Sequence, residues 1–204
     1  MSTNPNSRLE AFCDGVFAIA ITLLILEIKV PEVGEVHGPA DLWRAVGHEW
    51  PSFFALGLSF LIILIAWVNH HNMLKLINRT SPKFIYANGL LLLTVVILPF
   101  PTSMMAEYIQ TESAQTAIII FSLACLFHNI GWNVLAESMA PLFDEKHKQA
   151  LKEGRMICRI GFIVSASIVL VAIWFPYTAL VINTIVWFLY LFAGIFITQK
   201  AMKL

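Results

Sequence analysis

Residues 8–28 read RLEAFCDGVFAIAITLLILEI, and this stretch decides the fold class of the chain. Residues 15–26 carry no charge, and the whole segment is long enough to cross the apolar core of a bilayer as a helix. Asp14 lies near its start. Because an ionisable group at membrane depth is costly, it normally faces protein, water or a partner charge. The segment therefore predicts a first membrane helix whose acid either fixes helix packing or borders an ion path.

The remainder of the chain has the same apolar character. Of its 204 residues, 58% are hydrophobic and 13% are charged, whereas soluble domains carry about a quarter charged residues. Four further stretches contain no Asp, Glu, Lys or Arg, namely residues 51–74, 87–106, 113–136 and 160–199. The last would be roughly 60 Å long as one helix, twice the bilayer core, so it must hold two spans. Pro176 supplies the break, since proline disfavours helix in the residue before it.

These segments predict an all-α, polytopic membrane protein in which residues 1–204 form a single domain of six transmembrane helices. The spans cover about residues 8–28, 50–74, 84–108 and 114–138, followed by a tight hairpin within residues 160–199. Pro99 and Pro101 are expected to end or kink the third span. Residues 40–49 suit a short interfacial helix, and residues 140–155 suit a polar connector.

The basic residues predict the orientation. All Lys and Arg except Lys29 and Arg44 fall in the leader, in the loops after the second and fourth spans, or in the tail. The positive-inside rule then places both termini in the cytoplasm, in a multi-pass protein of the cell membrane. The formal net charge is zero, so the composition suggests no nucleic-acid partner.

The first span has two distinct faces. At 100° per residue, Ile19, Leu23 and Leu26 share a stripe within about 60° of arc, and Thr22 borders it. Asp14 lies about 140° from Ile19. An aliphatic stripe of this kind is typical of lipid contact or packing, and a pore lining is the alternative. If the stripe faces a pore, the acid faces the protein interior.

The second span ends in a polar group at the same membrane depth as Asp14. Trp67, His70 and His71 follow helical spacing along one face. A histidine that meets Asp14 could share a hydrogen bond with it, and Asn88 in the third span is a further candidate partner. Adjacent histidines point about 100° apart, which suits a metal poorly, so we expect no metal site and no cofactor.

A further polar cluster lies in the fourth span, at His128, Asn129, Trp132 and Asn133. Such side chains often hold membrane helices together, and that is the role expected here. The chain contains no nucleophile elbow, P-loop or dinucleotide fingerprint, so an enzyme is not indicated.

The motif Arg8-x-x-x-Phe12-Cys13-Asp14 resembles the opening of the first helix in the transmembrane protein 175 family of potassium channels, specifically its single-repeat prokaryotic members. The resemblance continues through residues 18–28 and Pro31, through Trp67 with His70 and His71, and from Asn88 to residues 98–101. One departure is Cys13, where the family has serine. A thiol is a weak donor, which puts polar contacts at this position in doubt.

The resemblance implies four six-span subunits around one pore that is lined by their first helices. It implies a constriction at Ile19, Leu23 and Leu26, and a role for Thr22 in favouring K⁺. The first helix would be held against the second and third spans by the motif residues Arg8, Phe12, Cys13 and Asp14, with Trp67, His70, His71 and Asn88 as their partners.

These expectations give a modestly K⁺-selective homotetrameric channel whose aliphatic rings form a hydrophobic gate, since a narrow apolar ring resists wetting. Its partners would be the lipid bilayer, the permeant K⁺ ions and further copies of the chain. The competing hypothesis is a proton- or cation-coupled secondary transporter that uses Asp14 with His70 or His71 as a relay. Inverted repeats and helices broken at mid-membrane, which are common in transporters, are not visible in the sequence. A non-transporting scaffold is the third class.

Overall fold

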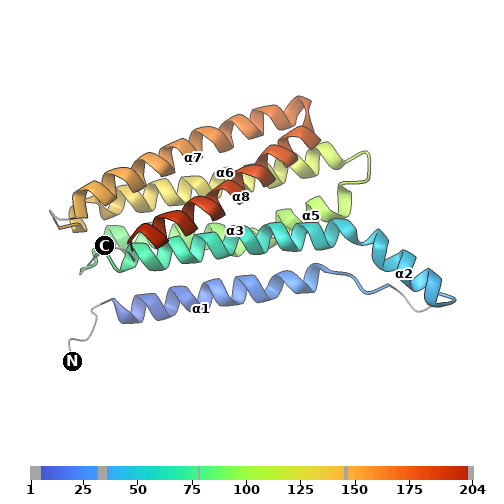
Figure 1. The fold of residues 1–204 in the computed structure, drawn as a ribbon, viewed down its shortest axis with the longest axis horizontal. Coiled ribbons are helices and arrows are strands. Elements are labelled where there is room, and N and C mark those ends of the chain that lie inside the picture. Colours follow the sequence, from blue (N-terminus) through green and yellow to red (C-terminus); the bar gives the residue numbers. More distant parts are fainter. Residues whose placement is uncertain (1–5, 32–35, 78, 145–146, 202–204) are drawn as a thin grey trace.

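The structure is a computed structural model that describes residues 6–31, 36–77, 79–144 and 147–201, with side chains described as far as Phe192 except that of Glu27. All regular elements in this part of the chain are helical, which confirms the all-α prediction (Figure 1). They are α1 Ser7–Leu23, η1 Leu24–Glu27, α2 Pro39–His48, α3 Trp50–Leu74, α4 Pro82–Ile97, α5 Pro99–Tyr108, α6 Ala114–Met139, η3 Ala140–Leu142, α7 Lys148–Trp174 and α8 Pro176–Ala201.

Five stretches of the described chain are long and apolar enough to cross a bilayer. They are Ser7–Leu26, Trp50–Leu74, Pro82–Tyr108, Ala114–Leu142 and Lys148–Trp174. The sixth predicted span corresponds to α8, Pro176–Ala201, in which Pro176–Phe192 is the apolar segment with described side chains and is shorter than the other five. The helices lie roughly side by side, as expected for a multi-pass membrane protein (Figure 1).

Prolines divide the helices where the sequence predicts breaks. Pro99 follows Leu98, at which α4 ends and α5 begins, and the ring fits the first turn of the new helix, where no amide proton is needed. Pro176 opens α8 in the same way. The preceding residue, Phe175, has φ −133° and ψ 68°, outside the helical region, as expected before proline. The helices α7 and α8 therefore form the predicted hairpin (Figure 1).

Two predicted boundaries differ from the structure. The connector 140–155 is not loop throughout, because α7 already begins at Lys148. Its first turns are rich in good helix formers, and Arg155 pairs with Glu137 on α6, which fixes them against the neighbouring helix. The first span is α-helical only to Leu23 and then tightens into the 3₁₀ turn η1, a common way for a helix to end.

The helix α6 lies at the centre of the polar contacts in the bundle. Its His128 Nδ1 lies 2.9 Å from Thr94 Oγ1 on α4, and its Asn129 donates to Ser165 Oγ on α7 at 2.8 Å. Asn133 donates to the backbone oxygen of Cys158 at 2.9 Å. The second polar cluster therefore joins α6 to its neighbours by hydrogen bonds of the kind that hold membrane helices together.

His128 is neutral in this arrangement. Trp132 donates its indole proton to Nε2 of the ring at 3.0 Å, so that nitrogen is an acceptor. Thr94 donates its own proton to the Leu91 carbonyl at 2.6 Å, which leaves Nδ1 of the ring to donate to the threonine oxygen. Both ring nitrogens are satisfied without a charge, which a buried site favours.

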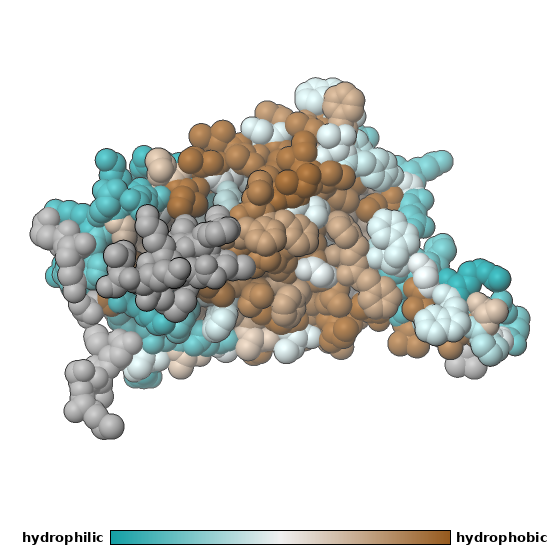
Figure 2. Space-filling view, viewed as in Figure 1, coloured by the Kyte–Doolittle hydropathy of each residue, from teal (hydrophilic) through white to brown (hydrophobic). Residues whose placement is uncertain are grey.

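Hydrophobic side chains cover the middle of the molecule and hydrophilic ones cover its two ends (Figure 2). One of these two ends contains the start of α1, the turn between α3 and α4, and the start of α7 (Figure 1). We call it the basic end. Its described basic side chains are Arg8, Lys75, Arg79, Lys83, Lys148, Lys152, Arg155 and Arg159. Lys146, Lys203 and the side chain of Lys200, which also enter the orientation prediction, lie outside the described part.

Candidate functional site

The helix α1 lies at the edge of the bundle and is covered along one face only (Figure 1). Its buried face, formed by Cys13, Phe17, Ala20 and Leu24, packs against the bundle. The opposite face carries the aliphatic row. Ile19, Leu23 and Leu26 are 61%, 48% and 73% exposed, which is unusual for large apolar side chains unless lipid or another chain covers them.

Asp14 is anchored to α3 by an aromatic side chain. The indole Nε1 of Trp67 donates a hydrogen bond to Asp14 Oδ1 at 2.8 Å, and both residues are partly buried. Hydrogen bonds to an ionised acceptor are about twice as strong as neutral ones. The partner of the acid is thus Trp67, one of the four motif partners that the resemblance implies, and neither a histidine nor Asn88, which their similar depth suggested.

Cys13, Asn88 and His70 link three helices in one chain of hydrogen bonds. The Asn88 Oδ1 lies 2.6 Å from His70 Nε2 on α3, and because an amide oxygen only accepts, the ring nitrogen donates. The Asn88 Nδ2 donates to Cys13 Sγ on α1 at 3.2 Å. All three side chains are buried. Cys13 keeps a polar contact as an acceptor, although the thiol is a weak donor.

Aromatic contacts complete the anchor. The ring of Phe17 on α1 meets the ring of His70 with centroids 5.5 Å apart. Trp67 and His71, one turn apart on α3, stack at 5.8 Å with an interplanar angle of 19°. The stacking orients the indole that donates to Asp14. His71 therefore supports the anchor through Trp67.

The first two motif residues lie apart from this anchor. Arg8 is exposed, and the Phe12 side chain is 62% exposed on the side of the aliphatic row. The implied role of these two in holding α1 against α3 and α4 is thus not fulfilled within one chain.

Thr22 borders the aliphatic row as the helical wheel predicts. Its hydroxyl donates to the backbone oxygen of Ile19 at 3.0 Å, which leaves the oxygen lone pairs free to accept. Beside it, α1 and α3 enclose an open apolar groove of about 470 Å³, lined by Ile21, Thr22, Ile25, Leu56, Gly57 and Phe60.

An ion pair lies just beyond the C-terminal end of α1 and η1. Lys29 Nζ donates to Glu107 Oε2 on α5 at 2.6 Å. The hydrogen bond and charge of Glu107 raise the pKa of Lys29, which keeps the ammonium charged. Both side chains are well exposed, so the pair contributes little to stability.

The described residues contain no group of three or more His, Cys, Asp or Glu side chains placed to hold a metal ion. The polar groups near α1 are instead paired with one another across helices. The arrangement fixes one face of α1 against the bundle and leaves the aliphatic row on its other face exposed.

Sequence reasoning found the residues of the anchor but not all of its pairs. The resemblance names Trp67 among the partners of the motif, but helical spacing does not distinguish it from the histidines as the partner of Asp14. The chemistry of the two side chains is the signal that could have identified this pair. An indole N–H can only donate and a carboxylate accepts, so a tryptophan at the depth of an acid is a natural partner.

Comparisons with known proteins agree on one family. The family model described as endosomal/lysosomal potassium channel TMEM175 matches residues 8–99. A potassium channel of Chamaesiphon minutus is 37% identical over 175 residues, which are 82% of this chain and 85% of that protein. A potassium channel of Streptomyces collinus is 42% identical over 137 residues, or 64% of this chain and 65% of that protein.

More distant relatives and a solved structure fit the same pattern. The endosomal/lysosomal proton channel TMEM175 of Bos taurus is 33% identical over 135 residues, which are 61% of this chain but 28% of that protein. The crystal structure of a lysosomal potassium-selective channel TMEM175 homolog from Chamaesiphon minutus superposes with a TM-score of 0.86 at 33% identity, covering 94% of this chain and 99% of that one. The chain therefore belongs to the TMEM175 family, a family of ion channels and not of enzymes.

Proposed function

We propose that this chain forms a cation channel that conducts K⁺ through a pore lined by α1 from four identical subunits. The observation that carries the proposal is the exposed aliphatic row of Ile19, Leu23 and Leu26, on a helix whose opposite face is firmly anchored. Several relatives are named potassium channels, which supports the choice of ion. Four copies of the row around one axis would give stacked apolar rings.

A stack of such rings would act as a hydrophobic gate. A narrow apolar constriction resists wetting and so blocks ions until it widens. Ile19 and Leu23 lie in α1 and Leu26 lies in the 3₁₀ turn η1, so the row presents aliphatic side chains, which cannot replace the hydration shell of an ion. Selectivity would therefore be modest, and the Thr22 hydroxyls would favour K⁺ by accepting contacts from a partly hydrated ion.

The proposal includes six spans with both termini in the cytoplasm and a location in the cell membrane. The basic end of the bundle holds nearly all described Lys and Arg side chains, and the positive-inside rule assigns that end to the cytoplasm. The hairpin at Phe175 returns α8 toward the same end, which supports α8 as the sixth span (Figure 1).

The arrangement of the polar groups disfavours the competing transporter hypothesis. A proton relay needs a connected path between its acid and its base. Asp14 is bound by Trp67, His70 is bound by Asn88, and His71 stacks on Trp67. Among the described side chains neither histidine shares a hydrogen bond with Asp14. These contacts fix helices in place and do not pass a proton from one residue to the other.

Potassium flux into liposomes that contain only this protein tests the proposal. The expected result is a passive current that reverses at the K⁺ equilibrium potential. A saturating flux coupled to a second ion would instead identify a carrier, and vesicles without any flux would indicate a scaffold. Protein-free liposomes and liposomes with heat-inactivated protein are the controls.

Asp14→Asn is expected to reduce the assembled oligomer more than it alters ion preference. The change removes the charge from the Trp67 hydrogen bond and should weaken the anchor of α1 by about 1 kcal/mol. Size-exclusion chromatography in mild detergent measures assembly, and reversal potentials measure preference. Trp67→Phe, which removes the donor and keeps an aromatic ring, although a smaller one, should reproduce the effect. A well-assembled Asp14→Asn channel with altered ion preference would show that the acid lines the pore.

A further inference from the structure

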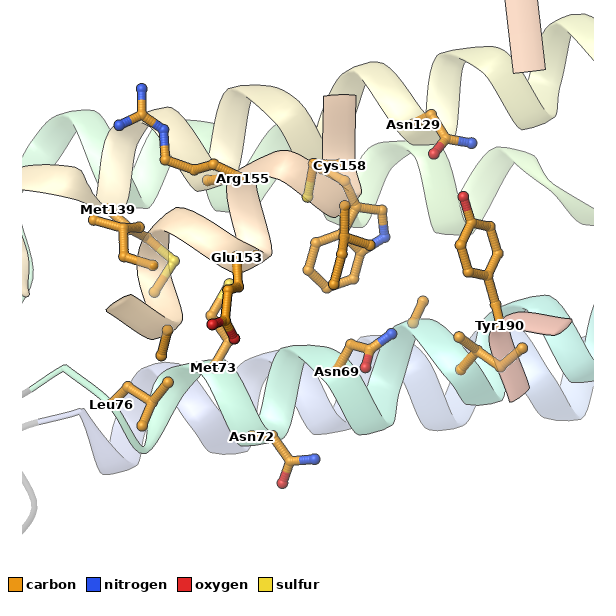
Figure 3. A pocket seen from close by; sticks show the side chains of 18 of the residues that line it. Asn69, Asn72, Met73, Leu76, Asn129, Met139, Glu153, Arg155, Cys158 and Tyr190 are labelled. Atoms are coloured by element: carbon orange, nitrogen blue, oxygen red, sulfur yellow. The ribbon is translucent and has the colours of Figure 1, made fainter. Parts of the chain in front are cut away.

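A cavity of about 360 Å³ lies between α3, α6, α7 and α8 toward the basic end (Figure 3). None of its lining residues belongs to α1, so it is separate from the proposed pore. Its size falls at the lower limit of pockets that hold small organic molecules. It was not foreseen from the sequence, because its lining comes from four helices that are far apart along the chain.

The cavity is mostly apolar with aromatic side chains in its lining. Ile65 and Ala66 on α3, Ala136 and Met139 on α6, and Ile157 on α7 supply aliphatic surface. The aromatic side chains are Trp132, Phe143, Trp187 and Tyr190. Such faces bind apolar groups and, through the negative potential of the ring face, attract cations.

One carboxylate, that of the exposed residue Glu153, lies at the rim of this apolar space. The side chain of Glu153 points from α7 toward α3, near Met73 (Figure 3). Gln149 donates one hydrogen bond to its Oε1 at 2.7 Å, which keeps the group in place without neutralising its charge. Asn69 brings an amide to the same cavity.

The basic residue of the cavity lining is already engaged. The guanidinium of Arg155 points away from the centre of the cavity and pairs with Glu137 on α6 through both Nε and Nη2 (Figure 3). Arg159 binds the same carboxylate at 3.0 Å. Among the described lining residues the charge that remains available to a ligand is therefore negative.

We propose that this cavity binds a small organic cation with an apolar body, such as a hydrophobic amine or a quaternary ammonium ion. Glu153 would pair with the positive group, and the aromatic and aliphatic walls would enclose the body. The negative charge disfavours the headgroup of an anionic lipid. A single carboxylate with amides is also too few ligands for a divalent metal ion, which takes six or more oxygens as calcium.

The test uses the full-length protein in nanodiscs of zwitterionic lipid, titrated with benzyltrimethylammonium and followed by calorimetry. Phenylmethanesulfonate, which has a similar shape and the opposite charge, is the matched ligand. Empty nanodiscs give the background from partition into lipid. The readout is binding alone, so the result does not depend on channel activity.

Two variants separate charge from shape. Glu153→Gln keeps the volume and removes the charge, and it should weaken binding of the cation about fivefold, as expected for a partly exposed ion pair. Gly154→Leu should weaken binding, because Gly154 lines the cavity and an added Cβ meets no atom within 4 Å, so the larger side chain is accepted and takes up room at the rim. Glu112→Gln, in the loop at the opposite end, should bind like the wild type.

The proposal is overturned by any of three results. They are the absence of binding at millimolar cation, equal binding of the sulfonate, and undiminished binding by Gly154→Leu. Binding that is unchanged in Glu153→Gln would likewise remove the assigned role of the carboxylate. The comparison of the two ligands needs only the wild-type protein, so it decides the question even where a variant folds poorly.

Discussion

A channel with Leu23→Ala is expected to pass severalfold more current at rest than the wild type and to discriminate less between K⁺ and Na⁺. The leucine lies in the middle of the exposed row on α1 and contributes little to the core of its own subunit. In the proposed tetramer, shortening it in every subunit at once would widen one complete ring. A wider apolar ring holds water more readily, so the barrier to ion entry falls.

Ile19→Ala should act in the same direction, since it widens the neighbouring ring one turn away. Because both side chains are exposed in the single chain, neither change is expected to alter folding by more than about 0.5 kcal/mol. This separates the predicted gain of current from a loss of structure. Planar-bilayer recordings with equal amounts of assembled protein measure the effect.

Ile163→Ala provides the matched control. Ile163 is 63% exposed on α7, similar to Ile19, but it lies on another helix with no link to the proposed pore. It should leave conductance and selectivity unchanged. If Leu23→Ala and Ile19→Ala also conduct like the wild type, the row lies against lipid or a flat interface, and the gate assignment is wrong.

Much of the helix architecture followed from the sequence, because it depends on local properties. The second span was predicted at residues 50–74 and is found as α3, Trp50–Leu74, since an uncharged run flanked by polar residues leaves little choice of ends. The breaks at Pro99 and Pro176 followed from the chemistry of proline. The start of α7 was missed because polarity alone does not distinguish a loop from a polar helical turn.

The contacts between helices were harder to predict from the sequence. Periodicity placed Asp14, His70 and Asn88 at a similar depth, but depth does not specify which side chains meet. The rotation of each helix decides that, and it depends on the packing of the entire bundle. The pairing of Asp14 with Trp67 and the cavity beside Glu153 both depend on this rotation.

Asn88→Leu is expected to destabilise the folded protein more than any other single change in the anchor, by about 2 kcal/mol. Asn88 is buried and serves two partners on two helices, His70 on α3 and Cys13 on α1. Its loss leaves the donor of His70 buried without a partner, and such a group costs more than the hydrogen bond contributed. Asn72→Leu, on an exposed position of α3, is the control and should be nearly neutral.

Thermal unfolding in detergent, followed by chromatography of the remaining folded protein, measures both variants. A double-mutant cycle with His70→Leu identifies the cause. If the penalty of Asn88→Leu comes from an unsatisfied histidine, removing that histidine as well should recover part of the lost stability, because replacing both partners with apolar groups is far less costly than replacing one. Strictly additive effects would show that the two side chains are not coupled and that Asn88 acts through its shape.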